Sequence, residues 1–223
     1  MTFATIEHAL EQLRSGRPVL VLDDEDRENE GDAILAAELA SPQWVGWMVR
    51  HTSGYLCAPM EDTRADRLGL PLMWSANTDP LRTRYTVSVD AATSTTGISS
   101  VERAATTRAL ADPRTTSADL IRPGHVLPLR ARDGGVLTRR GHTEAAVDLT
   151  RLAGLQAVGL IGEIVHDDGT CARTPDVLAL GQAEGLDVIT IESLANWRRS
   201  HEEQPSTTTP GSSTTRVSPT VSA

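Results

Sequence analysis

Seven of the ten residues from Asp23 to Asp32 carry a carboxylate, and they directly follow the apolar run at 18–22. Such a run is typical of a short buried strand, so the acidic cluster is expected at a strand end. Like charges this close repel one another and need either water or a counter-charge. A divalent cation meets that need because it binds carboxylate oxygens, and Arg27 adds a cation suited to phosphate.

Two other interpretations of the cluster were open, and spacing excludes one of them. A solvated acidic turn is the common form of a charge run, and the cluster alone does not exclude it. An EF-hand calcium loop would begin at Asp26, with Glu28, Glu30 and Gly31 at matching positions. Its twelfth residue would then be Ala37, where a bidentate glutamate is required. The cluster therefore needs partners from elsewhere in the chain.

Composition argues against several classes of protein. The 223 residues are 39% hydrophobic, which is enough for one large domain with a true core. The net charge of −9 argues against non-specific binding of nucleic acid, which needs a basic face. The sequence has no apolar run of membrane-spanning length and no basic-then-apolar leader. Cys57 and Cys171 lack metal-type spacing. We expect a cytoplasmic protein that binds neither nucleic acid nor a membrane.

Short apolar runs alternate with helical patterns along the chain. Strands are expected at 18–22, 33–37, 55–58, 85–89, 157–165 and 187–191. Helices are expected at 5–15, 42–50, 99–110, 142–153 and 176–184. The mixture predicts the α/β class, as a single-domain layered α-β-α fold with a mixed sheet over 1–200. Eleven of the last eighteen residues are Ser or Thr, so we expect a disordered tail over 201–223.

A second group of chemistry-bearing residues begins at Arg139 and Arg140, at the expected start of a helix. A helix N-terminus presents free N–H groups and partial positive charge, which favours an anion. Gly141 lets a ligand approach the backbone, and Thr143 can cap the helix or donate to a phosphate. His142 can bind a metal through a neutral ring nitrogen. An ordinary capped helix with a surface histidine would explain the same residues.

Three single residues carry weaker signals. His125 precedes the apolar run at 126–129, which is also expected to form a strand. A histidine in that position is more often structural than functional. Glu163 is a carboxylate inside an apolar run. A buried carboxylate must be paired, bound to a metal or shifted in pKa, which slightly favours a functional role. Cys57 is interpreted as a small core residue because the sequence shows no base beside it.

Six motifs together resemble the 3,4-dihydroxy-2-butanone 4-phosphate synthase family. In the family's order, they are DDEDRENEGD at 23–32, RHTSGYLC at 50–57, TTGIS at 95–99, RPGHVLPLRA at 122–131, RRGHTEAAVDL at 139–149 and DDGT at 167–170. The resemblance extends from about residue 4 to residue 199. It implies a lyase of riboflavin biosynthesis that converts D-ribulose 5-phosphate into L-3,4-dihydroxy-2-butanone 4-phosphate and formate. It also implies Mg²⁺ or Mn²⁺ as cofactor, with two ions per site.

The resemblance assigns roles to single positions. The metal pair is expected at Glu28 and His142. Catalytic roles are expected at His125, Glu163, Glu30 and Asp32. Substrate contacts are expected at Arg27, Glu28, Asp32, Thr96, Arg139, Arg140, Gly141, His142, Thr143 and Glu163. The family's homodimer, with its sites at the subunit interface, is implied as well.

The family's reaction explains why several carboxylates are needed. Removing a proton beside the ketone gives an enediolate, and later steps move further protons as water and formate leave. Acids and bases with different pKa values are therefore required in one site. Which carboxylate takes the first proton stays open, and our hypothesis is one within 28–32.

Departures from the family's pattern leave alternatives open. Cys171 stands where Met is common, and Gly162 stands where Cys is frequent. A paralogue acting on a related sugar phosphate is one alternative, and a non-catalytic metal- or phosphate-binding protein is another. Many family members also carry a fused GTP cyclohydrolase II domain with a cysteine-rich zinc site. Because this sequence has only two cysteines, we expect the monofunctional form.

Overall fold

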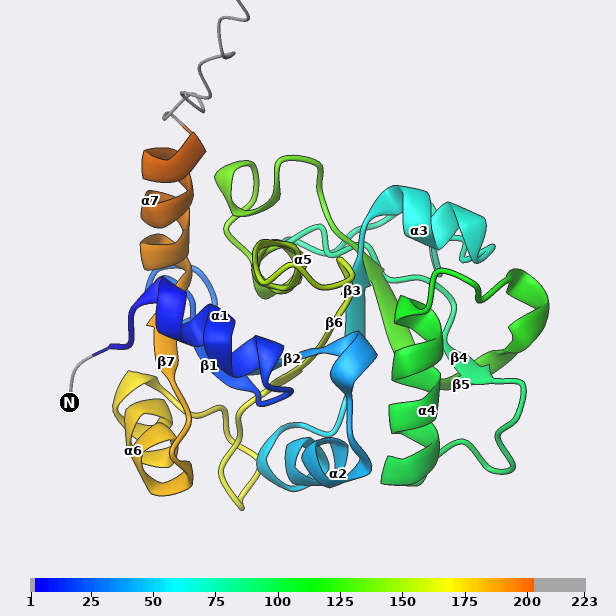
Figure 1. Ribbon diagram of the computed structural model, residues 1–223, viewed down its shortest axis with the longest axis horizontal. Helices are drawn as coiled ribbons and strands as arrows, with labels where there is room; N and C mark the ends of the chain where they lie inside the picture. Colours follow the sequence, from blue (N-terminus) through cyan, green and yellow to red (C-terminus); the bar gives the residue numbers. More distant parts are fainter. Residues whose placement is uncertain (1–2, 203–223) are drawn as a thin grey trace, which may run out of the picture.

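The computed structural model describes residues 3–202, which form helices on both faces of one sheet (Figure 1). The strands are β1 (Val19–Leu22), β2 (Gly31–Ala36), β3 (Cys57–Met60), β4 (Val89–Ala91), β5 (Leu120–Arg130), β6 (Gly159–Glu163) and β7 (Val188–Thr190). The α-helices are α1 (Ile6–Arg14), α2 (Pro42–His51), α3 (Asp62–Arg67), α4 (Ser100–Ala111), α5 (His142–Leu152), α6 (Thr174–Glu184) and α7 (Ile191–Glu202). Short 3₁₀ turns are η1 (Ala37–Leu39), η2 (Ser117–Asp119) and η3 (Gly135–Leu137).

The strands lie in the order β4-β5-β3-β6-β2-β1-β7. The pairs β1–β7 and β3–β5 are parallel, whereas β1–β2, β2–β6, β3–β6 and β4–β5 are antiparallel. The sheet is therefore mixed, and the expected layered α/β class is confirmed. Its order brings together strands that are far apart in sequence, so β6 lies between β2 and β3.

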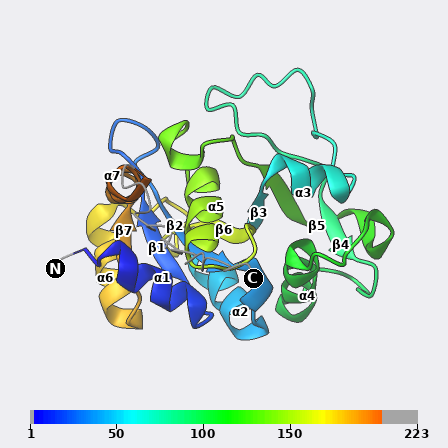
Figure 2. The same cartoon turned by 45° about the horizontal axis from the view of Figure 1, so that its top comes forward.

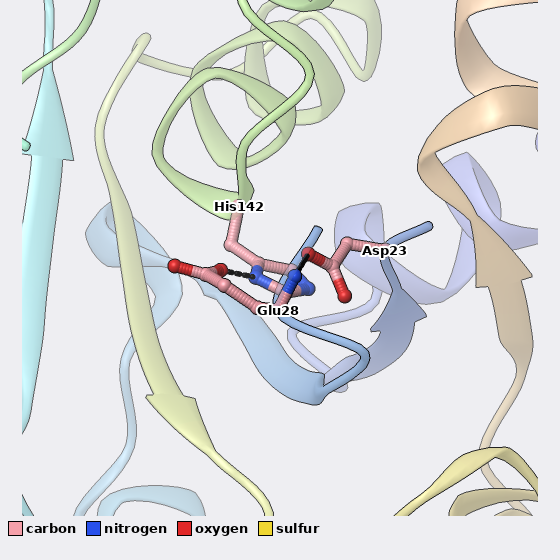
Figure 3. Close-up of side chains that lie close together, drawn as sticks. All are labelled: Asp23, Glu28 and His142. Carbon is pink, nitrogen blue, oxygen red and sulfur yellow. Dashed lines mark hydrogen bonds and ion pairs between the residues drawn. The ribbon is translucent and has the colours of Figure 1, made fainter. Parts of the chain in front are cut away.

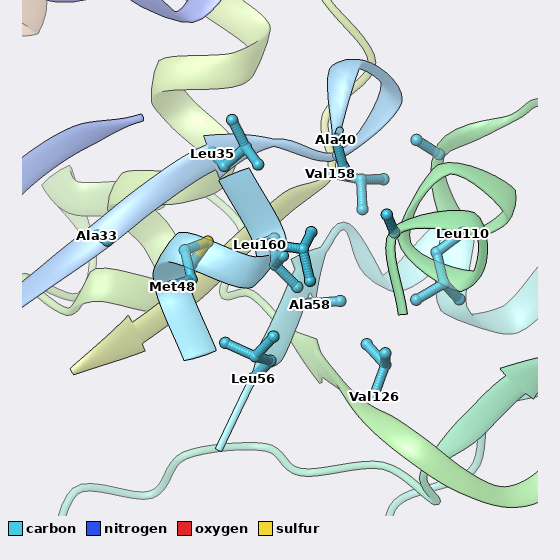
Figure 4. Packing of buried hydrophobic residues seen from close by; sticks show 14 of the residues in the cluster. Ala33, Leu35, Ala40, Met48, Leu56, Ala58, Leu110, Val126, Val158 and Leu160 are labelled. Carbon is cyan, nitrogen blue, oxygen red and sulfur yellow. The ribbon is translucent and has the colours of Figure 1, made fainter. Parts of the chain in front are cut away.

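Alternation along each strand sorts side chains to the two faces of the sheet. In β1, Leu20 joins the apolar cluster that packs on α2 and α4, whereas Val21 joins the cluster that packs on α1, α5 and α7. Figure 4 shows part of the first cluster, with Leu160 of the sheet near Met48 of α2 and Leu110 of α4. Burial on both faces explains why the central strands appear as unbroken apolar runs in the sequence.

Hydroxyl side chains cap the starts of several helices. Thr5 caps α1 and Ser41 caps α2, and each accepts a backbone N–H from the first turn. Ser99 caps α4 through the N–H of Glu102 at 3.2 Å. The Glu102 carboxylate does not close a capping box. It accepts instead the N–H and the hydroxyl of Thr95, at 2.5 and 2.8 Å, and so fixes the preceding loop.

Some expected elements differ in extent. The expected strand at 85–89 is mostly irregular, because β4 begins only at Val89 and its pairing with β5 shifts register there. Tyr85 and Thr86 form isolated bridges with Leu129 and Leu72. The apolar patterns predict neither α3 nor α7. The helix α7 includes the first two residues of the expected tail, and residues 203–223 lie outside the described part of the chain.

None of the helices within residues 3–202 combines the length and the apolar character that crossing a bilayer requires.

Candidate active site

A cavity at the N-terminus of α5 gathers most of the residues that the sequence singles out. Its walls are Arg27, Glu28, Glu30, Asp32, Cys57, Thr83, Tyr85, Leu129, Arg139, His142, Thr143, Ile161 and Glu163. Strand pairing explains part of this gathering, because Asp32 of β2 lies directly opposite Glu163 of β6. Cross-strand neighbours on an antiparallel pair share one face of the sheet. Two carboxylates are thus held side by side on the face that α5 covers.

Asp23 organises the acidic loop between β1 and β2. One of its carboxylate oxygens accepts the N–H of Glu30 at 2.9 Å. The other accepts the N–H of Glu28 at 3.1 Å and the guanidinium of Arg27 at 2.9 Å. Asn29 adopts a left-handed backbone with φ 54°, which asparagine tolerates better than most residues. The Asp23 side chain is fully buried, so the solvated-turn interpretation is wrong for this residue.

The ring of His142 is oriented by the backbone of β1. Its Nε2 donates to the carbonyl of Val21 at 3.1 Å, so Nε2 carries a proton. The other nitrogen, Nδ1, faces Glu28 at 3.5 Å and Asp32 at 3.4 Å. Figure 3 shows His142 reaching from the start of α5 toward Glu28 and Asp23. A hydrogen bond to one ring nitrogen commonly orients the other toward a metal.

Burial and neighbouring charges separate the pKa values of three groups. Burial alone would raise the pKa of Glu28, but the His142 ring and the Arg27 guanidinium lower it to about 2. Burial alone would lower the pKa of His142, but Asp32 and Glu28 raise it to about 9. Burial raises the pKa of Asp32 to about 8, and the charge of Glu163 adds to the rise. The pKa values of Asp32 and His142 are thus raised, whereas that of Glu28 is lowered.

The donor atoms fit a divalent cation. Ligand atoms of Asp23, Glu28 and His142 lie within 4.8 Å of one another. Asp23 is held by two N–H groups of the loop backbone, whereas Glu28, which accepts the Arg27 guanidinium at 2.6 Å, faces Nδ1 of His142. Glu28 and His142 are therefore the candidate ligand pair. The Oδ1 atom of Asp32 is buried beside them without a hydrogen-bond partner within residues 3–202. Hard cations accept such oxygens, and His142 would release its proton when Nδ1 binds the ion.

Two guanidinium groups converge on the backbone where α5 begins. A β-carbon added at Gly141 would lie 2.2 Å from Nη1 of Arg139 and 3.0 Å from Nη2 of Arg27. Gly141 is the N-cap of α5 and offers no side-chain acceptor to the first turn. Free N–H groups, the helix dipole and two guanidiniums therefore favour a phosphate at this point, beside the buried Thr143.

Arg139 also ties the long loop between α3 and β4 to the site, and Figure 2 shows this loop arching beyond the sheet. Its Nη2 donates to the Leu81 carbonyl at 3.0 Å and to the Thr83 hydroxyl at 3.2 Å. Its Nη1 donates to Glu144 at 2.6 Å. These contacts fix the guanidinium before any ligand arrives.

Besides Gly141, which lies at the start of α5, three expected site residues do not line this cavity. Arg140 faces Asp24 at 3.4 Å on the outer side of the acidic loop. Thr96 lies in the loop before α4, and His125 lies on β5, which two strands separate from β2. The His125 ring contacts Asp90 at 2.8 Å, and its backbone N–H donates to the same carboxylate at 2.9 Å.

Several cavity residues carry no usable signal in the sequence. Thr83, Tyr85, Leu129 and Ile161 look like ordinary strand or loop residues, and only the order of strands in the sheet brings them together. Alternation along β6 would have predicted that Ile161 shares a face with Glu163.

The sequence likewise does not predict that Ser53 and Cys57 lie beside Glu163. Ser53 donates its hydroxyl to Glu163 at 2.6 Å across a large sequence separation. Cys57 is buried, and burial raises the pKa of its thiol, which agrees with the expected core role although the residue borders the cavity.

Comparison with known proteins gives a consistent result. The family model for 3,4-dihydroxy-2-butanone 4-phosphate synthase matches residues 7–197. Riboflavin biosynthesis protein RibBA of Salinispora arenicola is 57% identical over 204 residues, which is 91% of this chain and 49% of that protein. This chain thus spans about half the length of the curated relatives it matches.

Two solved structures match over nearly their whole length. A crystal structure of 3,4-dihydroxy-2-butanone 4-phosphate synthase in complex with two magnesium ions aligns with a TM-score of 0.86 at 43% identity, covering 90% of this chain and 99% of that one. The synthase of Candida albicans aligns with a TM-score of 0.83 at 47% identity, covering 89% and 99%.

Proposed function

This chain belongs to the 3,4-dihydroxy-2-butanone 4-phosphate synthase family, and we propose that it converts D-ribulose 5-phosphate into L-3,4-dihydroxy-2-butanone 4-phosphate and formate. One observation carries the proposal. A cation-binding pair, Glu28 and His142, lies in the same cavity as two guanidiniums at the start of α5. A sugar phosphate needs both halves, one for its phosphate and one for its oxygenated carbon chain.

Residues of different charge have different proposed roles. Arg27 and Arg139 bind the phosphate, together with the N–H groups at the start of α5. Glu28 and His142 hold Mg²⁺ or Mn²⁺, with two ions per site. The bound ion supplies Lewis-acid stabilisation of negative charge on the substrate. Asp32, with its pKa raised to about 8, provides a proton donor, and Glu30 and Glu163 are the carboxylates positioned to accept protons.

The test is formate release from ribulose 5-phosphate by the purified chain. We expect formate and the four-carbon phosphate in equal amounts with Mg²⁺ or Mn²⁺, and none with excess chelator. Metal binding without turnover would refute the proposal in favour of a non-catalytic protein. Turnover of another pentose or tetrose phosphate instead would favour the paralogue.

We further infer that the synthase domain spans 1–200 and acts in the cytoplasm.

A homodimer explains the residues that do not line the cavity. We infer that Thr96, His125 and their neighbour Asp90 complete the site of a second copy, because the cavity of their own chain excludes them. Arg140 remains a proposed substrate contact at the mouth of the acidic loop.

Co-expression of two inactive variants tests the shared site. Glu28→Gln and His125→Ala each remove one half of every site, but in a mixed dimer one of the two sites is intact. Random pairing should therefore restore about a quarter of wild-type formate release. If each site lies within one chain, mixing restores nothing. Size-exclusion chromatography with light scattering supplies the control for dimer formation.

A further inference from the structure

Tyr85 lines the cavity beside Glu30 and Glu163, although no role is assigned to it above. Its backbone is held by β5, through a bridge to Leu129, and its carbonyl accepts the N–H of Met73 at 2.9 Å. Its ring is partly buried and packs on the apolar cluster under α5. The phenol is thus a fixed part of the wall and not the tip of a loop.

Within residues 3–202 the hydroxyl of Tyr85 makes no hydrogen bond to another group, so its donor capacity is unused. Burial raises the pKa of Tyr85, and the nearby Cys57 and Tyr55 add to the rise, so the phenol keeps its proton at neutral pH. A phenol in this state is a hydrogen-bond donor at every working pH.

The charges of the groups that line the cavity explain why a neutral hydrogen-bond donor is useful there. Four carboxyl groups line the cavity, and those that are ionised repel negative charge that develops on a bound sugar: Glu28, Glu30, Asp32 and Glu163. The guanidiniums that would offset this repulsion lie together at Gly141, where they suit the phosphate. A neutral donor among the apolar residues of the wall can stabilise developing charge on the carbon chain without carrying charge itself.

We propose that Tyr85 is a further catalytic residue, whose hydroxyl donates a hydrogen bond to an oxygen of the sugar-phosphate carbon chain as negative charge develops there. The proposal rests on the function proposed above. No covalent step is involved, and the proton stays on the phenol throughout.

Two matched substitutions test the role, because Tyr85 has a close partner that does not line the cavity. The rings of Tyr55 and Tyr85 lie 6.4 Å apart, and each variant to Phe loses one hydroxyl while keeping its ring. For Tyr85→Phe we expect kcat to fall by roughly 10²-fold, as when one donor to a developing oxyanion is removed. KM should stay within about threefold, because the contact strengthens only in the transition state. Tyr55→Phe should match the wild type in both constants.

Each other outcome has a definite meaning. An unchanged kcat for Tyr85→Phe overturns the proposal, and so does a rise in KM alone, which would indicate ordinary substrate binding. A similar loss in both variants would point to altered ring packing and would also overturn it. Thermal melting and Mn²⁺ titration of both variants separate unfolding or metal loss from a kinetic effect. A wild-type chain that releases no formate refutes the proposed function itself, so the two failures are distinguishable.

Discussion

Replacing Glu28 with Gln should abolish metal-dependent formate release while leaving the protein folded. Glu28 is ionised in the site, with its pKa lowered to about 2, and it is one half of the proposed cation-binding pair. Glutamine keeps the shape but removes the charge that holds the ion. If ion stabilisation amounts to about 4 kcal/mol, turnover falls by about 10³-fold.

The fold should survive this change because the former partners of Glu28 keep other contacts. Arg27 still pairs with Asp23 at 2.9 Å, and His142 still faces Asp32 at 3.4 Å. The matched control is Glu25→Gln, an exposed carboxylate of the same loop that does not line this cavity. Kinetics, Mn²⁺ titration and thermal melting should be measured on both variants. Full activity of Glu28→Gln, or loss of activity in both variants, would contradict the metal assignment.

Replacing Gly141 with Ala should weaken substrate use without straining the backbone. Gly141 has φ −114° and ψ 159°, an extended conformation that alanine adopts readily. The added methyl group, however, would lie 2.2 Å from Nη1 of Arg139 and must displace it. Loss of one charged hydrogen bond to phosphate costs about 1.5–3 kcal/mol, so kcat/KM should fall by roughly 10- to 100-fold.

A second glycine provides the control for this prediction. A β-carbon at Gly46, within α2, would meet nothing nearer than Ser100 at 3.6 Å, so Gly46→Ala should keep wild-type kinetics. Both variants should melt within about 5 °C of the wild type, with Gly46→Ala at the higher end because alanine favours helix. Unchanged kcat/KM in Gly141→Ala would show that Arg139 does not bind the phosphate where the structure holds it.

Local patterns predict much of the fold because the local physics agrees with the global structure. Apolar runs bounded by charge predict β1 and β2, and helical patterns predict most of α1, α2, α4, α5 and α6. The irregular course of 85–88 could not be predicted, because its alternating pattern is that of a strand. Tyr85 and Thr86 make only isolated bridges, to different partners, and β4 shifts register against β5 just after them; both are tertiary effects.

The candidate site also has one part that the sequence predicts and one part that it does not. The charged half is visible in the sequence because seven carboxylates in ten residues and a pair of arginines before a helix are rare patterns. The apolar half, with Tyr85 and Leu129, depends on β5 lying next to β3, which no local pattern specifies. The role of Asp23 could not be predicted either. In a sequence, a carboxylate that binds backbone N–H groups looks the same as one that binds a metal.

The ordering of the acidic loop by Asp23 affects how quickly the site can bind a metal ion. The chain between Asp23 and Glu30 loses its conformational freedom during folding, because one carboxylate holds two of its N–H groups. An arriving cation therefore meets ordered ligands, and chain ordering does not limit its association rate. The slow step is then loss of water from the ion, and Mg²⁺ dehydrates reluctantly. Rates of metal loading should follow the water-exchange rate of the ion and change little with the viscosity of the solvent.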